Sequence, residues 1–317
     1  MASNFLKCLV VGAGVIGRGW VYVFSRAGCP TRIYDEDPAQ MQKAISWFNS
    51  TLEEDIKDGF ITRAEAKDCR ALISSHSRLE EAMEGVEYIQ ESGPENLEVK
   101  RSIFQRVDRS SDLGTIIASS TSSLDIDAIA QGVRGIRRCI TAHPFNPPHI
   151  VPVVEVLPAK ETDPDVTTAT VEFLKRIGQK PIVMNHFVVG YLINRIQAAV
   201  VREALHLVTK GVASVEAVDT LMSDGLGLRW ALFGSFGINH TNADGGIREY
   251  YSRYGKAYQS IMSDLDSTPP AFDPDMIEFI GKGVDEMLGK TPVADHCRWR
   301  DRLVRRIRDL KEQDPRP

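Results

Sequence analysis

The stretch Cys8–Asp35, which reads CLVVGAGVIGRGWVYVFSRAGCPTRIYD, has the pattern of a strand, a glycine-rich turn, a helix and a second strand. Its first four residues form a short apolar run that is typical of a buried parallel strand. A helical pattern follows from Val15 to about Ala27 and ends at Gly28, and Thr31–Tyr34 is the next predicted strand. This order predicts the first unit of a doubly wound α/β domain.

The turn after the first strand carries the pattern G-x-G-x-x-G, formed by Gly12, Gly14 and Gly17. The first glycine permits a tight turn, the second lets the backbone approach a pyrophosphate, and the third lets helix and strand pack closely. Val15 and Ile16 lie in the first turn of the helix, whose free N–H groups and positive dipole end attract phosphates. We therefore predict that Gly12, Gly14, Val15, Ile16 and Gly17 bind a dinucleotide.

An acidic residue, Asp35, stands at the end of the second predicted strand. A carboxylate at this place can hold both ribose hydroxyls of an adenosine. Glu36 and Asp37 follow it and would repel a 2′-phosphate. The sequence therefore predicts NAD rather than NADP as the cofactor.

The composition is that of an ordinary globular protein of 317 residues, 43% hydrophobic and 26% charged, long enough for two domains. A net charge of −5 argues against a nucleic-acid partner and against an anionic membrane surface. The 5 cysteines are scattered without a C-x-x-C pair, which favours reduced thiols over disulfides or a metal site. No apolar run approaches the ~20 residues that span a bilayer. The apolar N-terminal stretch reads as the first strand rather than a signal peptide, so we expect a cytoplasmic protein.

Strand and helix patterns continue to alternate up to residue 188. The further predicted strands are Tyr88–Glu91, Thr115–Ala118, Cys139–Ala142, Val153–Leu157 and Pro181–Met184. The predicted helices are Ala39–Asp58, Thr62–Cys69, Arg78–Met83, Leu97–Asp108 and Val166–Ile177. These elements predict a Rossmann-type, doubly wound, mostly parallel sheet as a domain over residues 1–188.

From Gly190 the pattern is helical throughout. Apolar residues keep a helical period from Leu192 to Val208, Gly211 ends that helix, and Ser214 caps the next, which runs to about Met222. Further helical pieces are Gly246–Tyr254, Lys256–Leu265, Pro274–Leu288 and Cys297–Lys311. We predict an all-helical domain over residues 189–317. The apolar surface of its 190–208 helix exceeds the need of a small helical domain, which predicts a homodimer formed through this domain.

Three polar side chains are predicted where strands end, on the ligand side of the sheet. His143 follows a strand in a loop rich in proline and asparagine, Glu155 lies on or near the next strand, and Ser122 follows the preceding strand. A dehydrogenase that acts on a secondary alcohol needs a base for the hydroxyl proton beside the nicotinamide. His143 is the candidate base, Glu155 the carboxylate that orients it, and Ser122 a donor to the reacting oxygen. A lone histidine in a loop is also often structural, and the residue pattern alone leaves that alternative open.

These residues occur in runs that resemble the signature of the 3-hydroxyacyl-CoA dehydrogenase superfamily over nearly the whole chain. The runs are Ser122, His143-Pro-Phe-Asn-Pro147, Glu155 and Gly190-Tyr-Leu-Ile-Asn-Arg195. The resemblance implies NAD as cofactor, a Rossmann domain followed by a helical one, and His143 as the general base with Glu155 as its partner.

The same resemblance implies roles for four residues. Ser122 and Asn194 would bond the reacting oxygen of the substrate, and Glu95 and Lys100 would lie near the nicotinamide ribose. For Asn194 the alternative is helix capping or a bond between helices. For Glu95 and Lys100 it is a surface pair of charges.

Within the superfamily, several stretches resemble the lambda-crystallin group, which are L-gulonate 3-dehydrogenases. They are Ser119–Ser123, Ala142–Pro148, Met222–Arg229, Asn242–Gly245 and Trp299–Asp301. This resemblance implies NAD-dependent oxidation of the 3-hydroxyl of a small L-hydroxy acid, with L-gulonate as the expected substrate and 3-dehydro-L-gulonate as the product. We predict that Arg229 binds the substrate carboxylate, with a structural salt bridge as the alternative.

Three other functions stay open. The stretch Gly227–Ala231 also resembles carnitine dehydrogenases, whose quaternary ammonium substrate would want an aromatic cage such as Trp230 and Phe233 could form. A 3-hydroxyacyl-CoA substrate would need phosphate-binding cations, and candidates are Lys57, Arg63, Lys67 and Arg70. A crystallin-like structural protein would bind NAD without needing the catalytic set.

Overall fold

The computed structural model describes residues 6–315 and divides the chain into two compact units, Met1–Arg195 and Ile196–Pro317. The division falls within helix α8 (Tyr191–Thr209). The domain boundary between residues 188 and 189 stays a prediction. Each unit is described separately below.

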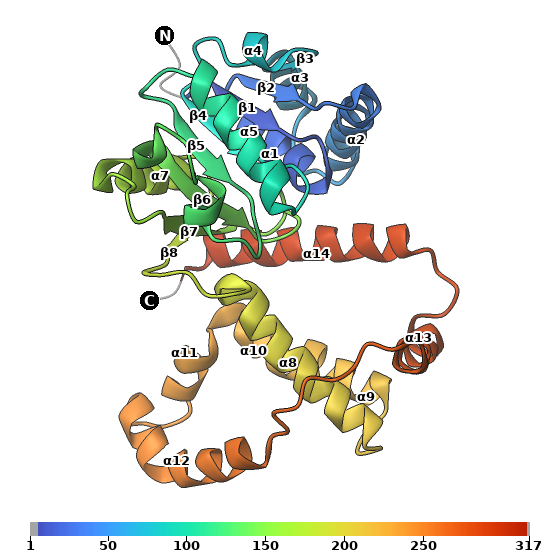
Figure 1. Ribbon diagram of the computed structural model, residues 1–317. Helices are drawn as coiled ribbons and strands as arrows, with labels where there is room; N and C mark the ends of the chain where they lie inside the picture. The colour runs from blue at the N-terminus through green and yellow to red at the C-terminus, as the bar shows by residue number, and fades with distance from the viewer. Residues whose placement is uncertain (1–5, 316–317) are drawn as a thin grey trace. The chain divides into compact units, whose positions relative to one another are not determined.

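The first unit is built on an eight-stranded sheet in the order β3-β2-β1-β4-β5-β6-β7-β8 (Figure 1). The strands are β1 Cys8–Val11, β2 Thr31–Tyr34, β3 Ile73–His76, β4 Tyr88–Glu91, β5 Ile116–Ser119, β6 Cys139–Pro144, β7 Val153–Pro158 and β8 Lys180–Val183. Neighbouring strands are parallel except β6 and β7, which are antiparallel. The doubly wound, mostly parallel sheet expected from the sequence is confirmed.

Helices cover both faces of this sheet. They are α1 Val15–Arg26, α2 Pro38–Lys57, α3 Arg63–Ala71, α4 Leu79–Ala82, α5 Leu97–Ser110, α6 Ile126–Ile129 and α7 Pro164–Arg176, with a 3₁₀ turn at Ile136–Arg138. Cys8 and Val10 of β1 pack on the side of α1, α2 and α7, while Leu9 and Val11 pack on the side of α4, α5 and α6. Side chains alternate along a strand, so both faces of β1 are apolar and buried. Figure 1 shows α5 crossing one of these faces.

Local signals in the sequence explain where several helices begin and end. The Asp37 side chain accepts a hydrogen bond from the Ala39 N–H at 2.9 Å and caps α2, whose first residue is Pro38. Thr62 and Glu65 form a reciprocal capping box at the start of α3. These two helix starts follow from the sequence alone.

Two features of the sheet differ from the sequence-based prediction. The strand β3 was not predicted, because Ile73–His76 is a polar, partly exposed edge strand without an apolar run. The strand β6 extends to Pro144, so His143 lies on the strand and not in the loop after it. The cause is tertiary: β6 stays paired with β7 as far as Pro144, which lies opposite Val154.

The described part of the second unit is helical and contains no strand, as the sequence predicts. Its helices are the remainder of α8, α9 Val215–Thr220, α10 Gly227–Leu232, α11 Ser235–His240, α12 Gly246–Asp264, α13 Pro274–Leu288 and α14 Val293–Gln313, with a π-helical segment at Leu221–Leu226. The two pieces predicted around Gly255 form the single helix α12. A glycine within a helix costs only about 1 kcal/mol relative to alanine, which the rest of a long helix can offset.

Three further properties bear on the class of protein. All 5 cysteines are free thiols, and four of them are buried. Among residues 6–315, the structure places no group of His, Cys, Asp and Glu side chains suited to hold a metal ion. No helix in this described range has the length and apolar character needed to cross a membrane.

Candidate active site

The predicted site residues of the first unit gather at one edge of the sheet. The strands β1, β4, β5 and β6 are neighbours, and all four run parallel and end at this edge. The glycine turn follows β1, the segment Ser92–Glu95 follows β4, and Ser120–Ser123 follows β5. In doubly wound sheets this edge, at the carboxyl ends of the strands, is where ligands bind.

The glycine turn has the shape that a pyrophosphate needs. Gly12 has a positive φ of 102°, and a Cβ there would lie 2.6 Å from the Ser92 backbone. A Cβ at Gly17 would lie 1.8 Å from the Gly12 carbonyl oxygen, so only glycine lets α1 approach the turn this closely. Gly14, the N-cap of α1, forms no side-chain cap and has open space where its Cβ would be. The turn therefore leaves the N-terminus of α1 accessible to a phosphate.

The acidic residue after β2 is fixed against the same turn. One carboxylate oxygen of Asp35 accepts the Ala13 N–H at 2.7 Å, and the other accepts the Asp37 N–H at 2.8 Å. Each carboxylate oxygen can accept a further hydrogen bond, so both remain able to receive a ribose hydroxyl. The glycine turn and Asp35 together fit the phosphates and adenosine ribose of NAD.

We expect Gly17→Ala to weaken NAD⁺ binding by about tenfold or more, a loss of at least ~1.4 kcal/mol. The added methyl group would meet the Gly12 carbonyl and push α1 away from the turn. Titration of NADH fluorescence measures the dissociation constant. Gly255→Ala in α12, where a Cβ meets nothing within 4 Å, is the matched control. Unchanged affinity in Gly17→Ala would show that the turn does not hold the cofactor.

His143 and Glu155 are partners across two antiparallel strands. They lie directly opposite each other in β6 and β7, and Nδ1 of His143 is 2.8 Å from Oε2 of Glu155. The Glu155 side chain is fully buried and His143 nearly so. A carboxylate only accepts hydrogen bonds, so it holds the hydrogen on Nδ1 and leaves the Nε2 lone pair of a neutral imidazole free. This geometry suits a general base.

The other oxygen of Glu155 binds the start of α8. It accepts the N–H groups of Leu192 and Ile193 at 2.6 and 2.9 Å. These bonds satisfy two of the N–H groups that a helix start leaves unpaired. Tyr191, just before them, has a positive φ of 51°. Glu155 is therefore held on both sides, and it fixes the first turn of α8 beside His143.

Asn194 lies one turn into α8 and reaches the segment after β5. Its Nδ2 lies 3.4 Å from the Ser122 carbonyl oxygen. The structure thus brings Asn194 and Ser122 together, as it does His143 and Glu155. The Asn194 amide thus contacts the Ser122 segment, whereas the sequence alone leaves a helix cap or a bond between helices open. The catalytic roles of these four residues stay predictions.

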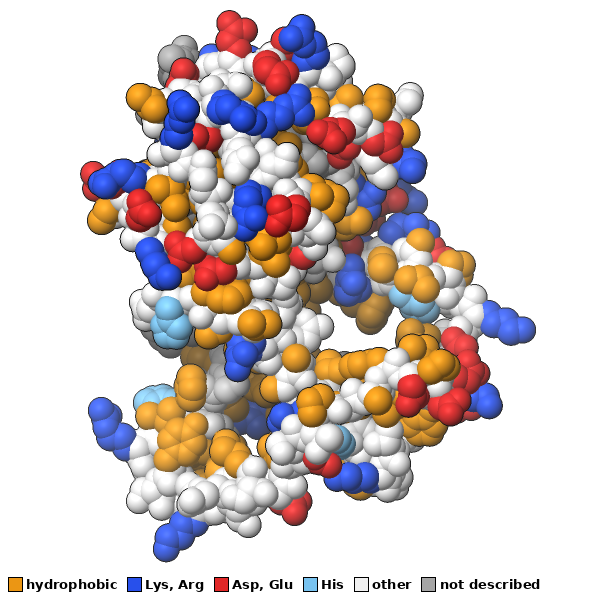
Figure 2. Space-filling model, viewed as in Figure 1, with side chains coloured by type: hydrophobic (Ala, Val, Ile, Leu, Met, Phe, Trp, Pro, Cys, Tyr) orange, Lys and Arg blue, Asp and Glu red, His pale blue; other side chains and the backbone are white. Residues whose placement is uncertain are grey.

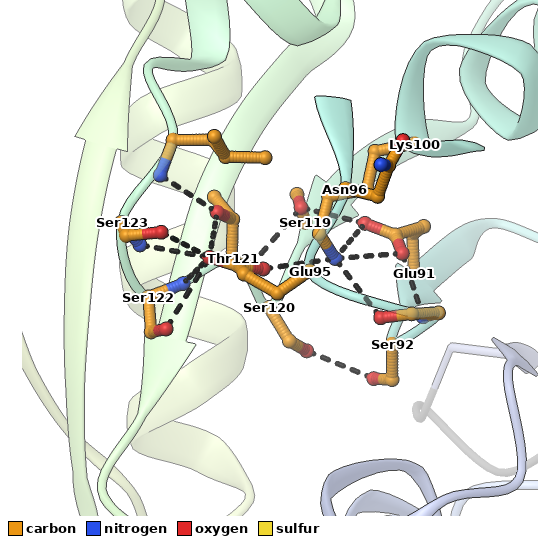
Figure 3. Close-up of polar contacts among 12 residues, drawn as sticks. Glu91, Ser92, Glu95, Asn96, Lys100, Ser119, Ser120, Thr121, Ser122 and Ser123 are labelled. Carbon is orange, nitrogen blue, oxygen red and sulfur yellow. Dashed lines mark hydrogen bonds and ion pairs between the residues drawn. The ribbon is translucent and has the colours of Figure 1, made fainter. Parts of the chain in front are cut away.

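Glu95 and Lys100 do not form a surface pair of charges. The Lys100 side chain is only 1% exposed and contacts both Glu91 and Glu95. Glu95 accepts hydrogen bonds from the segment Thr121–Ser123 (Figure 3). Their predicted place beside the nicotinamide ribose stays a prediction. Sequence reasoning missed Glu91, and the one available signal was an acidic residue that ends an apolar strand.

Arg229 belongs to the second unit. Its guanidinium donates to the amide oxygen of Asn242 at 3.0 Å. This partner is an amide and carries no charge, so the contact is not a salt bridge. The predicted bond from Arg229 to a substrate carboxylate stays a prediction.

Comparison with known proteins identifies the family. The NAD-binding domain of 3-hydroxyacyl-CoA dehydrogenase matches residues 7–187, and the C-terminal domain of that enzyme family matches residues 190–276. The chain belongs to the 3-hydroxyacyl-CoA dehydrogenase family. NAD is therefore its cofactor, and the family is one of NAD-dependent 3-hydroxyacyl dehydrogenases. The assignment of the glycine turn and Asp35 to this cofactor stays a prediction.

Relatives of this 3-hydroxyacyl-CoA dehydrogenase family member cover almost its full length. Lambda-crystallin of Oryctolagus cuniculus is 34% identical over 308 residues, with 96% of each chain covered. L-carnitine dehydrogenase of Oceanobacillus iheyensis is 30% identical over 307 residues, covering 96% of this chain and 98% of the relative. Among solved structures, an NAD⁺-dependent dismutase, 5-formyl-3-hydroxy-2-methylpyridine 4-carboxylic acid 5-dehydrogenase, has a TM-score of 0.79 at 22% identity and covers 99% of this chain and 100% of its own. The structural similarity shows a shared fold.

Proposed function

We propose that this protein oxidises the 3-hydroxyl of a small L-3-hydroxy acid to the 3-keto acid, with L-gulonate as substrate and 3-dehydro-L-gulonate as product. The observation that carries the proposal is the buried His143–Glu155 pair beside the nucleotide-binding edge of the sheet. The choice of L-gulonate follows from the resemblance to the lambda-crystallin group, and a lambda-crystallin that is 34% identical over 308 residues supports that resemblance.

Each residue of the proposed site has a distinct role. His143 takes the hydroxyl proton at Nε2, and the Glu155 carboxylate stabilises the imidazolium that forms. A positioned acid or base of this kind contributes about 10²–10⁴-fold to a rate. Ser122 and Asn194 bond the reacting oxygen and hold it at His143.

The cofactor-binding residues are proposed from the same geometry. Gly12, Gly14 and Gly17, with Val15 and Ile16 in the first turn of α1, hold the pyrophosphate. Asp35 holds the adenosine ribose, and NAD⁺, when bound, accepts the hydride from the substrate carbon. Arg229 is the proposed partner of the substrate carboxylate.

Steady-state NADH production on four substrates tests this function. The panel is L-gulonate, L-carnitine, 3-hydroxybutyrate and 3-hydroxybutyryl-CoA. We expect the highest kcat/KM with L-gulonate. A higher kcat/KM with the CoA ester would contradict the small hydroxy acid, and no turnover with NAD⁺ still bound would favour a structural NAD-binding protein.

L-carnitine is the second candidate substrate. L-carnitine dehydrogenases are among the relatives that cover nearly the whole chain. A quaternary ammonium is recognised by aromatic faces, which Trp230 and Phe233 would have to supply. Preferential turnover of L-carnitine in the same panel would select this alternative.

We also propose that the protein is a homodimer formed through its helical unit. In the described part of this unit, Leu205 and Val208 are the buried large apolar side chains, while many others are exposed. Examples are Ile196, Leu221, Leu228, Phe236, Ile261, Phe272, Ile277 and Phe279. Figure 2 shows hydrophobic side chains in orange over the helices of this unit. Apolar surface of this extent marks an interaction site in a soluble protein.

Light scattering after gel filtration tests the dimer. We expect the mass of two 35.2-kDa chains at micromolar concentration. Because the apolar side chains lie on the helical unit, Ile277→Glu and Phe279→Glu together should shift the mass toward one chain. A single-chain mass for the unmodified protein would contradict the dimer.

A further inference from the structure

A buried ion pair lies behind the Ser122 segment, and it has no assigned step in the proposed proton transfer. Lys100 Nζ is 3.0 and 3.2 Å from the two carboxylate oxygens of Glu91, and the two side chains are 1% and 0% exposed. Removing such ions from water costs several kcal/mol for each, which only close pairing and further hydrogen bonds offset. The pair therefore needs a well-defined set of partners.

Those partners join three segments of the chain. Lys100 also donates to the Gly93 carbonyl at 3.2 Å. Glu91 accepts the Gly93 N–H and the Ser119 hydroxyl, each at 2.6 Å. The ion pair thus ties the ends of β4 and β5 to the start of α5. A cation in the first turn of a helix is disfavoured by the helix dipole, so Lys100 depends on its carboxylate partners.

Glu95 uses its two oxygens for two different purposes. Oε2 lies 3.5 Å from Lys100 Nζ. Oε1 accepts the N–H groups of Ser122 and Ser123 at 2.8 and 2.9 Å, and the Thr121 hydroxyl at 2.7 Å. Figure 3 shows Glu95 between the Lys100 side and the Thr121–Ser123 segment. Both oxygens of Glu95 therefore act as acceptors.

The surroundings of Glu95 keep it ionised. Partial burial raises the pKa of this carboxyl group, but the hydrogen bond from Thr121 and the charge of Lys100 lower it. The bonds from Ser122 and Ser123 lower it further, and the net pKa lies below the usual value. These contacts require an ionised Glu95, because only a carboxylate can accept hydrogen bonds at both of its oxygens.

We propose that Glu95 is a positioning residue for Ser122, held in place by the buried Glu91–Lys100 pair. It fixes the main chain of the Thr121–Ser123 segment through two N–H groups. The Ser122 hydroxyl lies 3.3 Å from Glu95, the longest of these contacts, so it is the one most easily exchanged for a substrate oxygen. The inference rests on the proposed function, in which Ser122 bonds the reacting oxygen, and it adds a second role for Glu95 to its predicted place near the nicotinamide ribose.

The variant Glu95→Gln tests this role with little change of shape. A glutamine offers one acceptor and one donor group, so it cannot accept hydrogen bonds at both ends. Its NH₂ must face either the Lys100 ammonium or the Ser122 and Ser123 N–H groups. We expect kcat with the best substrate of the panel to fall about tenfold to a hundredfold, since a full donor to the reacting oxygen contributes about 10²–10³-fold.

Glu98→Gln is the matched control on the same helix. Glu98 is 77% exposed and pairs with Arg101 alone among the described residues. The kcat, KM and NAD⁺ affinity of the Glu98→Gln variant should equal those of the unmodified protein. A tenfold weaker NAD⁺ affinity in Glu95→Gln, with kcat unchanged at saturating NAD⁺, would identify a cofactor contact and overturn the proposal.

Amide hydrogen exchange supplies a readout that needs no substrate. In Glu95→Gln, exchange in a peptide that covers Thr121–Ser123 should become faster, while in Glu98→Gln it should not change. Unchanged exchange in Glu95→Gln would overturn the proposal. If the unmodified protein turns over none of the panel substrates, the proposed function fails, and this exchange comparison still decides whether Glu95 holds the segment.

Discussion

His143→Ala is expected to lower kcat by about 10²–10⁴-fold, while the dissociation constant of NAD⁺ stays within a few-fold. The reason is that Nε2 of His143 is the proposed acceptor of the hydroxyl proton, and no nucleotide contact is assigned to this residue. Steady-state NADH production and a fluorescence titration of the cofactor measure the two quantities.

Two further variants make the His143 result interpretable. His143→Gln can still donate a hydrogen bond toward Glu155, and its thermal unfolding shows whether lost activity reflects lost structure. His186→Ala replaces an exposed histidine and should leave kcat unchanged. Unchanged turnover in His143→Ala would remove this residue from the proposed mechanism.

Lys100→Met is expected to lower stability by about 3–5 kcal/mol, because it leaves the Glu91 carboxylate buried without its cation. For a unit of this size that loss corresponds to a fall in melting temperature of roughly 6–20 °C. Thermal unfolding followed by circular dichroism measures the change. The fall in stability should exceed the fall caused by replacing an exposed lysine or arginine, because surface ion pairs contribute little.

A double variant and a surface control separate the burial of charge from loss of the lysine stem. Lys100→Met combined with Glu91→Gln removes both charges, and it should recover part of the stability lost in the single variant. Lys160→Met replaces a lysine that is 88% exposed and should leave the melting temperature unchanged. A Lys100→Met protein as stable as the unmodified one would contradict the buried pair.

Most of the sheet could be predicted because buried parallel strands are short apolar runs. The strands β1, β2 and β4 have the predicted bounds, and α2 begins at Pro38, one residue before the predicted helix start at Ala39. Where tertiary contacts decide, the prediction failed. The edge strand β3 is polar, and β6 extends through His143 only because β7 pairs with it.

The same division applies to the candidate site. The glycine turn and Asp35 could be predicted because they lie in one continuous stretch, and their spacing alone places them together. The contacts of Glu95 with Ser122 join residues 27 positions apart, across two loops whose paths no local pattern determines. The bonds from Glu155 to the start of α8 involve backbone N–H groups, which carry no signal in the sequence.

Isotope transfer from the substrate tests the proposed reaction most directly. The substrate preferred in the panel, carrying deuterium on C3, would be oxidised by the unmodified protein, and the NADH formed would be analysed by mass spectrometry. We predict one deuterium in each NADH molecule, and NADH formation at least about 10²-fold slower with His143→Ala. NADH without deuterium would contradict oxidation at the 3-hydroxyl.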